Sequence, residues 1–448
     1  MTIVPDKMAA AERLSEALRF ETVSHQDPGK FHPQAFLDLR DFLEMAFPDV
    51  HGALKREVVN DYSLLYTWEG TDSEQKPILL MGHLDVVPVE PGTENRWTHP
   101  PFSGRIADGY IWGRGSMDDK VAGLGILEAV ETLLAQGFRP SRTVYLAFGH
   151  DEEIGGHQGA AEIASLLRSR GVRFEYLIDE GLAIGHGLIP GIAAPVAMIG
   201  IAEKGRLVLE LTAASGGGHA SMPPSQTAIG ILSAAIQKLE ANPMATSMKE
   251  PVRQLFAALG PAMPFVQRLV LANLWLLEPL VRYQLASSPS TNALVRTTGA
   301  VTLVRAGTKE NVLPSEAMAV VDFRILPGDS IAAVVEHVRR VIDDPRIAIR
   351  QLQGNEPSPV SDAAAPSFGA LAASIRQVFP EVIVAPGLTV AGTDTKHYVS
   401  ISDAAYRFLP LRLGPEDLPR IHGTDERIAV DNYAEIAAFY LQLLRDSG

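Results

Sequence analysis

The sequence has no cysteine among its 448 residues. This absence excludes a disulfide scaffold, thiolate metal sites, iron–sulfur clusters and a cysteine nucleophile. Any metal site must therefore be built from histidine, aspartate and glutamate. The N-terminus also lacks a basic segment followed by an apolar core, so we expect no signal peptide and a cytoplasmic location.

The sequence also has fewer basic than acidic residues. It contains 39 lysines and arginines and 53 aspartates and glutamates, which gives a formal net charge of -14. Nucleic acid binding needs a basic footprint, so we expect no nucleic acid partner. The most apolar stretch, residues 265–281, is interrupted by charged residues and a proline well short of the roughly 20 apolar residues of a bilayer span. We expect it to form an amphipathic packing helix; the alternative is an apolar wall for a substrate or a second subunit.

What the sequence does contain is an ordinary globular balance, with 46% hydrophobic and 21% charged residues. Apolar runs alternate with helical patterns up to about residue 180, which predicts an α/β fold with a mostly parallel sheet covered by helices on both faces. The expected elements are a helix over 9–20, strands over 78–81, 143–148 and 176–178, and helices over 119–136 and 159–170.

The pattern changes near residue 200 to the order β-α-β-β-α-β, which is typical of a ferredoxin-like α+β domain. The expected elements are strands over 207–212, 300–305, 317–325 and 347–352 and helices over 228–239 and 331–342. We therefore predict a catalytic domain made of residues 1–199 and 354–448. Residues 200–353 would form an inserted lid and dimerisation domain, with 354–359 as the return linker.

Three of the apolar runs of the first domain end in acidic residues or histidine. The first ends in His83 and Asp85, the second in a segment that includes Glu152 and Glu153, and the third in Asp179 and Glu180. The carboxyl ends of parallel strands meet at one edge of a sheet, where α/β proteins build their sites. Imidazole and carboxylate are ligands that zinc accepts, so this edge is a candidate metal site.

Two local patterns allow more than one interpretation. Ser116 can cap a helix that opens near Asp118, and Asp118 is either a further capping residue at the helix dipole or a carboxylate with one oxygen for each of two cations. Glu152 and Glu153 are adjacent, and adjacent side chains of an extended chain point opposite ways. One could bind a metal while the other faces a reacting water; the alternative is a solvated acidic turn.

Several spaced motifs give the chain a resemblance to the metal-dependent M20 peptidase family, closest to the carboxypeptidase S branch with its N-acyl-amino-acid hydrolases. The resemblance covers nearly the whole chain. The motifs that carry it are residues 82–88 (GHLDVVP), 97–104, 113–120 (GRGSMDDK), 151–156 (DEEIGG) and 421–423 (IHG).

The resemblance implies two Zn²⁺ ions per chain, with Co²⁺ or Mn²⁺ as alternatives. It implies His83 on one metal, His422 and Glu153 on the other, and Asp118 as the bridge. The remaining ligand would be Asp179, which we prefer, or Glu180. Asp85 would accept the other ring N–H of His83, and Glu152 would be the general base.

Further residues follow from the same resemblance. His219 would reach into a partner subunit's active site to bind the scissile carbonyl, which implies a homodimer through the inserted domain. Arg324 would hold the substrate carboxylate, with Asn292 and Gly392 as weaker substrate-binding candidates. A glycine-rich surface loop for His219 and a structural ion pair for Arg324 are the alternatives.

The function expected from this resemblance is hydrolysis of the amide bond of short peptides or N-acyl amino acids, releasing an amino acid with a free carboxylate. A dipeptidase or a desuccinylase-type deacylase on the same scaffold is the alternative. A further alternative is a metal-binding scaffold protein without catalytic activity, which would be expected to lack ligands or the base; none of the implied set is missing.

Overall fold

The computed structural model describes residues 6–447. Residues 1–5, on which the prediction of no signal peptide partly rests, lie outside this range. Within residues 6–447, no helix combines the length and the apolar character that crossing a bilayer requires.

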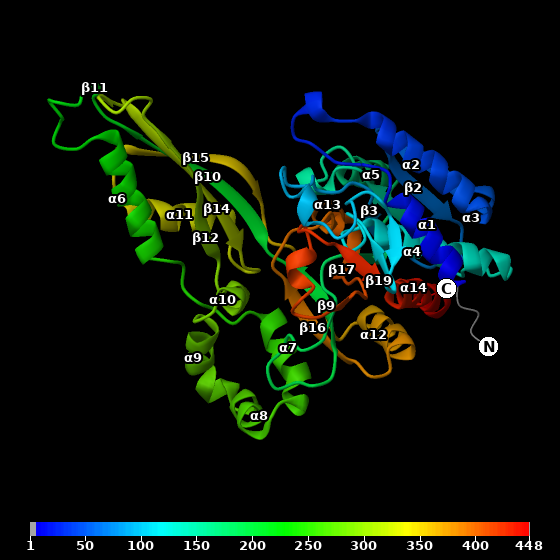
Figure 1. Cartoon of the computed structure of the whole chain (residues 1–448). Coiled ribbons are helices and arrows are strands. Elements are labelled where there is room, and N and C mark those ends of the chain that lie inside the picture. Colours follow the sequence, from blue (N-terminus) through cyan, green and yellow to red (C-terminus); the bar gives the residue numbers. More distant parts are fainter. Residues whose placement is uncertain (1–5, 448) are drawn as a thin grey trace.

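A large mixed sheet forms the body of the molecule (Figure 1). Its strand order is β1-β2-β6-β3-β7-β17-β9-β8-β18, with β16 paired to β9, and the central strands β6, β3, β7 and β17 are parallel. The strands are β1 (Lys55–Val59), β2 (Ser63–Trp68), β3 (Ile78–His83), β6 (Val144–Gly149), β7 (Phe174–Asp179), β8 (Ile184–Gly185), β9 (Val196–Glu203), β16 (Ile383–Thr389), β17 (Ser402–Arg407) and β18 (Arg412–Leu413).

Helices cover both faces of this sheet because its strands alternate apolar side chains between the two faces. In β3, Ile78 and Leu80 belong to one core and Leu79 and Met81 to the other. The first core also takes up α1 (Lys7–Ala17), α2 (Pro33–Ala46), α3 (Pro48–Ala53), α4 (Lys120–Ala135), α12 (Pro366–Val378) and α14 (Val430–Ser447). The second takes up α5 (Ala160–Ser169) and the short α13 (Thr395–Tyr398).

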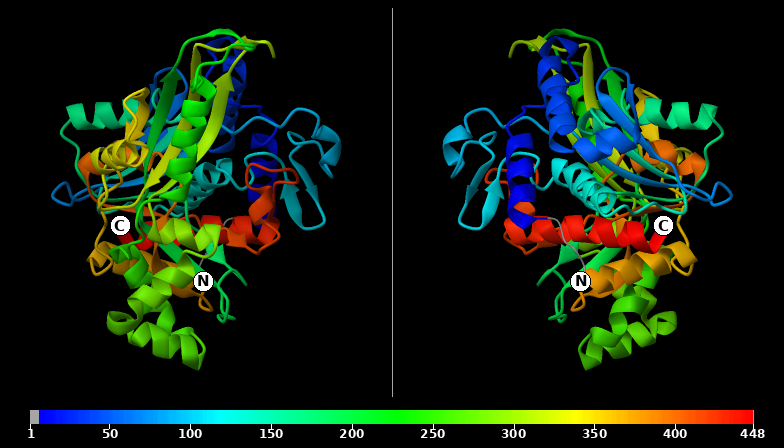
Figure 2. Two further views of the ribbon diagram at one scale, coloured as in Figure 1. Left: turned by 90° about the vertical axis from the view of Figure 1, so that its left-hand side faces the viewer. Right: turned by 90° about the vertical axis from the view of Figure 1, so that its right-hand side faces the viewer.

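A second sheet of four antiparallel strands lies to one side of the first (Figure 1) and faces the viewer in the left view of Figure 2. Its elements follow the predicted β-α-β-β-α-β order. They are β10 (Gly205–Ala214), α6 (Ala228–Ala241), β12 (Thr298–Ala306), β14 (Glu316–Ile325), α11 (Ile331–Ile342) and β15 (Ile347–Asn355). One face of this sheet packs on α6 and α11 through a core of its own, and the other face turns away from those helices.

The chain changes sheet between Glu203 and Gly205, since β9 pairs within the large sheet as far as Glu203. It returns after Asn355, so Gly354 and Asn355, expected in the linker, still pair with β10. We propose 205–355 as the inserted domain, slightly shifted from the predicted boundaries.

The apolar stretch 265–281 forms two helices, α8 (Phe265–Ala272) and α9 (Leu274–Leu285), rather than one. They follow α7 (Glu250–Leu259) and precede α10 (Pro289–Val295), and they project at the bottom of Figure 1, away from the tip that carries β11 (Gly218–His219). Neither α8 nor α9 contains a buried residue, although Leu274, Val281 and Leu285 of α9 pack against a small buried cluster of Met248, Val252 and Val295. The prediction of a packing helix therefore holds only for one side of α9.

Candidate metal centre and substrate cavity

A cavity of about 680 Å³ lies between the carboxyl edge of the large sheet and the inserted sheet. Its size is typical of a small-molecule site. The part of the lining that belongs to the large-sheet domain carries the acidic side chains and the histidines, together with Lys396; we call it the acidic wall. Lys204, Arg206 and Arg324 line the part at the inserted sheet, which we call the basic wall. The charged residues and histidines that line the cavity are Asp118, Glu152, Glu153, His157, Glu180, Lys204, Arg206, Arg324, Lys396, His397 and His422.

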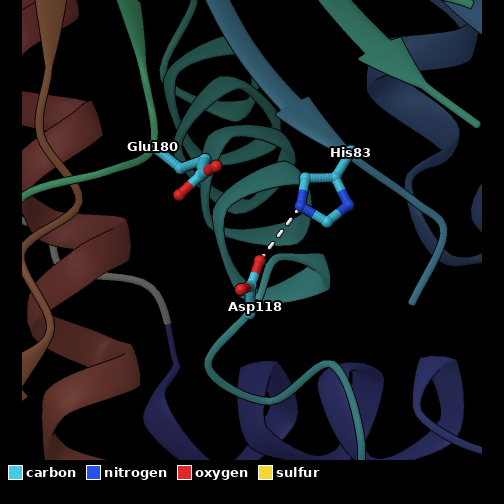
Figure 3. Close-up of side chains that lie close together, drawn as sticks. All are labelled: His83, Asp118 and Glu180. Carbon is cyan, nitrogen blue, oxygen red and sulfur yellow. Dashed lines mark hydrogen bonds and ion pairs between the residues drawn. The ribbon is translucent and has the colours of Figure 1, made fainter. Parts of the chain in front are cut away.

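Asp118 is the centre of the acidic wall, because its two carboxylate oxygens face two different histidines. His83 Nε2 lies 3.0 Å from Asp118 Oδ1, and His422 Nε2 lies 3.0 Å from Asp118 Oδ2. His83 is the last residue of β3, and Figure 3 shows its ring directed at the loop that carries Asp118. A carboxylate placed in this way can bridge two cations.

Two groups of three donors share Asp118. His83, Asp118 and Glu180 form one group, and Asp118, Glu153 and His422 form the other; within each, the potential ligand atoms lie within 4.8 Å of one another. In Figure 3 the Glu180 carboxylate lies beside His83 and Asp118. Each group matches the mixed nitrogen and oxygen donors that Zn²⁺ accepts.

The preference for Asp179 over Glu180 is not supported by the geometry. Asp179 Oδ2 accepts hydrogen bonds from Thr395 N at 2.9 Å and Thr395 Oγ1 at 2.8 Å. Its other oxygen accepts the Glu180 N–H at 3.0 Å. Asp179 therefore binds α13, and Glu180, one residue beyond the strand, faces the cavity.

Asp85 holds three parts of this wall together. His83 Nδ1 lies 3.0 Å from the Asp85 main-chain oxygen and 3.3 Å from its carboxylate, so both acceptors fix the ring. The two carboxylate oxygens also accept the N–H groups of Glu152 and Glu153, each at 3.1 Å. Burial opposes its charge, but the bonds from His83 and Ser24 still leave the pKa of Asp85 below its ordinary value.

The extended conformation assumed for Glu152 and Glu153 is wrong. These residues start a 3₁₀ turn, η3 (Glu152–Ile154), and Asp85 accepts its first two N–H groups. Both side chains nevertheless reach the cavity. Ser116 does not cap a helix either, because α4 begins at Lys120 and the N–H groups of the preceding loop are bonded to Glu426.

The electrostatics of the acidic wall fit a divalent cation. Burial raises the pKa of Glu152 and of Glu180 well above the ordinary value, and neighbouring acids add to this effect. Glu153 Oε1 is buried without a hydrogen-bond partner among residues 6–447, although it lies 3.2 Å from His422 Nε2. Crowded buried carboxylates are unfavourable unless a positive charge neutralises them, so this donor set suits a metal.

The basic wall belongs to the start of the inserted sheet. Arg206 and Arg324 lie opposite each other on β10 and β14, and Asp322 lies between them. Asp322 accepts from Arg324 Nε at 2.9 Å through one oxygen and from Arg206 Nε at 2.8 Å through the other. This leaves the two terminal nitrogens of Arg324, a geometry suited to a carboxylate.

Two of the predicted site residues lie elsewhere. His219 is an exposed residue at the tip of the inserted domain and is not among the residues that line the cavity. Asn292 accepts a hydrogen bond from Arg296 Nε at 2.9 Å and is likewise outside the described lining. Gly392 lines the cavity, whereas residues 265–281 do not, which contradicts the idea that they form its apolar wall.

The sequence analysis missed Lys204 and Arg206. Lys204 is buried at the change of sheet, and its Nζ donates to the main-chain oxygens of Ala293 at 3.0 Å and Arg296 at 2.8 Å. Both residues follow the apolar strand β9, so the signal that identified His83 and Glu180, an apolar run ending in charge, could have found them.

Comparison with known proteins gives concordant results. A family model described as Peptidase family M20/M25/M40 matches residues 79–446. "Probable carboxypeptidase S-like 2" of Dictyostelium discoideum is 45% identical over 442 residues, covering 98% of this chain and 85% of that protein. "N-fatty-acyl-amino acid synthase/hydrolase PM20D1" of Xenopus tropicalis is 41% identical over 446 residues, covering 99% and 86%.

Among solved structures, the M20 family metallo-carboxypeptidase Sso-CP2 from Sulfolobus solfataricus superposes with a TM-score of 0.74 at 19% identity. The match covers 97% of this chain and 98% of that one. At this identity the likeness establishes the fold, which agrees with the predicted α/β class.

Proposed function

The chain belongs to peptidase family M20/M25/M40, as its motifs predict, and from that premise we propose that it is a two-cation amidohydrolase. The observation that carries this proposal is the position of Asp118, whose two oxygens each lie 3.0 Å from a different histidine. His83, Asp118 and Glu180 would hold one cation, and Asp118, Glu153 and His422 the other. Zn²⁺ suits these donors, with Co²⁺ and Mn²⁺ as alternatives.

When bound, the cations would supply Lewis acidity that polarises a carbonyl and makes water more acidic. The chain's own contribution to the reaction is the Glu152 carboxylate. It takes one proton from the attacking water, whose oxygen bonds to the amide carbon, and gives that proton to the nitrogen when the C–N bond breaks. Burial raises the pKa of Glu152 above its ordinary value, which makes the carboxylate a stronger base than an exposed glutamate.

The basic wall and the apolar residues of the cavity suggest the class of substrate. Arg324 would bind the free carboxylate of the amino acid through its terminal nitrogens. Besides the charged residues, the cavity is lined by the apolar side chains of Leu182, Ala183, Leu409, Leu411, Leu413 and Ile421. An apolar acyl group or side chain fits there, so we favour N-acyl amino acids over dipeptides. The Xenopus tropicalis relative named for N-fatty-acyl-amino acids supports this choice.

The test is turnover of metal-loaded protein on N-acyl amino acids of increasing acyl length and on dipeptides, with the released amino acid measured by mass spectrometry. We expect Glu152→Gln to lower kcat by about 10²- to 10⁴-fold with the metal content unchanged. Glu162→Gln, on the exposed side of α5, is the control. Unaltered turnover in Glu152→Gln would exclude this base, and a preference for dipeptides would favour the dipeptidase alternative.

We also propose a homodimer through the inserted domain. The strand β12 is at an edge of its sheet, and β11, which carries His219, lies at the far end of this sheet from β3 (Figure 1). We infer that His219 acts in the cavity of a partner chain rather than in its own. Activity recovered by mixing His219→Ala and Glu152→Ala chains would support this arrangement, and verified mixed dimers without recovery would contradict it. A cytoplasmic location stays a prediction.

A further inference from the structure

A buried ion pair behind the acidic wall joins residues that are far apart in the sequence. Arg114 Nη1 lies 2.6 Å from Glu426 Oε2, and the side chains are 2% and 0% exposed. Neither residue is among those that line the cavity. A buried ion pair generally adds little to the stability of a fold. The segments that Arg114 and Glu426 bind therefore indicate the role of this pair.

Glu426 holds the loop that carries Asp118. Its Oε1 accepts the main-chain N–H groups of Gly115 at 2.9 Å, Met117 at 2.8 Å and Asp118 at 3.3 Å. These are charge-assisted hydrogen bonds, which are stronger than neutral ones. They fix the main chain of the loop up to Asp118 itself.

Arg114 holds the turn that carries His422. Its Nη2 donates to the main-chain oxygens of His422 at 3.2 Å and Gly423 at 3.1 Å. His422 has a φ of +60°, a left-handed conformation that is uncommon for a residue with a side chain and needs support from its surroundings. One guanidinium thus joins Glu426 to this turn.

We propose that Arg114 and Glu426 are positioning residues that set the distance between Asp118 and His422, and so build the second cation site of Asp118, Glu153 and His422. This inference rests on the proposed two-cation function. The first group, His83, Asp118 and Glu180, takes two of its donors from β3 and the end of β7, so it depends less on the pair. Asp118 belongs to both groups, but only the second uses His422, so the bonds of Arg114 to the His422 turn act selectively on the second site.

Arg114→Lys is the sharpest variant, because lysine keeps the charge opposite Glu426 but lacks the second terminal nitrogen that binds the turn. We expect the affinity for the second Co²⁺ or Zn²⁺ to fall by about 10- to 100-fold, the usual effect of removing a partner that orients a ligand. The affinity for the first cation, at the site of His83, Asp118 and Glu180, should change by less than about 3-fold, well below the loss expected at the second site. Calorimetric titration of the full chain and the visible spectrum of bound Co²⁺ measure both.

Arg13→Lys is the matched control. Arg13 forms a similar pair with Glu128, with Nε 2.6 Å from Oε1, and neither residue lines the cavity. Both affinities should be unchanged in this variant. If Arg114→Lys does not fold, the double variant Arg114→Met with Glu426→Gln removes both charges and is titrated in its place.

Wild-type affinities at both sites in Arg114→Lys, or in the double variant, would overturn this inference and leave the proposed function intact. Equal weakening of both sites would also overturn it, since the effect would then be general. A wild-type chain that binds only one cation would overturn the proposed function and this inference together.

Discussion

The two walls of the cavity differ in how their charged side chains are held. On the acidic wall, His83, Glu153 and Asp118 are 2%, 8% and 19% exposed, and main-chain and carboxylate contacts from several segments fix them. His422 is the exception at 49% exposed, and its turn is held by Arg114. On the basic wall, Arg206 and Arg324 are 46% and 39% exposed, and both depend on Asp322. Rigid, buried groups suit the bond-breaking step, whereas adaptable groups suit recognition of varied substrates.

The largest expected effect comes from the acidic wall. Glu180→Gln should abolish binding of the cation shared with His83 and lower kcat by at least about 10²-fold, because an amide does not replace an anionic ligand. Metal content by mass spectrometry and turnover measure this.

Asp179→Asn is the matched comparison one residue earlier. It should keep the cations and lower only the free energy of unfolding, by about 1–3 kcal/mol, since its bonds run to Thr395. If Asp179→Asn lost the cation and Glu180→Gln kept it, our assignment of these two residues would be reversed.

This pair also shows how far the sequence could lead. The apolar runs before His83 and Glu152 predicted the site because a buried strand, and the polar residues at its end, can be recognised from neighbouring residues alone. The choice between Asp179 and Glu180 depends on Thr395, more than 200 residues away, which binds Asp179. Nothing near residue 179 signals that contact.

The basic wall illustrates the same limit. Arg324 was found by resemblance, but its neighbour Arg206 lies beside it only through the antiparallel register of β10 and β14. Register is a property of the assembled sheet, and a sequence pattern fixes it only where one face is clearly buried. The ion pair of Arg114 with Glu426 was missed for the same reason.

A smaller effect is expected on the basic wall. Arg324→Gln should raise KM by about 10- to 100-fold with kcat little changed, because a charged hydrogen bond to the substrate contributes about 1.5–3 kcal/mol to binding. Asp322→Asn should show the same pattern more weakly, since Asp322 only orients Arg324.

Steady-state kinetics with free and amidated substrates separates recognition from general damage. The amidated substrate should not respond to either change. Arg350→Gln is the control: Arg350 is 69% exposed on the same sheet, pairs with Glu210, and is outside the described lining. A fall in kcat rather than a rise in KM would show that the basic wall takes part in bond breaking.

The smallest expected effect concerns Lys204, which lies on the basic wall but is as buried as His83. Burial lowers its pKa to about 8. Below pH 8 the ammonium group is charged in both the folded and the unfolded chain, and its burial destabilises the fold in full. Between pH 8 and the unfolded value of about 10.4, only the unfolded chain keeps the proton, so the free energy of unfolding should rise with pH.

Urea unfolding at pH 7.5 and 9.5, in the presence of a chelator, measures this rise as the difference between the wild type and Lys204→Met. We expect the wild type to gain on the order of 1–2 kcal/mol relative to the variant. Taking the difference between the two proteins removes the contribution of other groups that titrate between pH 7.5 and 9.5, because both proteins contain them. Parallel pH profiles would mean that Lys204 keeps its ordinary pKa, and that its main-chain acceptors, the oxygens of Ala293 and Arg296, compensate for burial as fully as Asp85 does for His83.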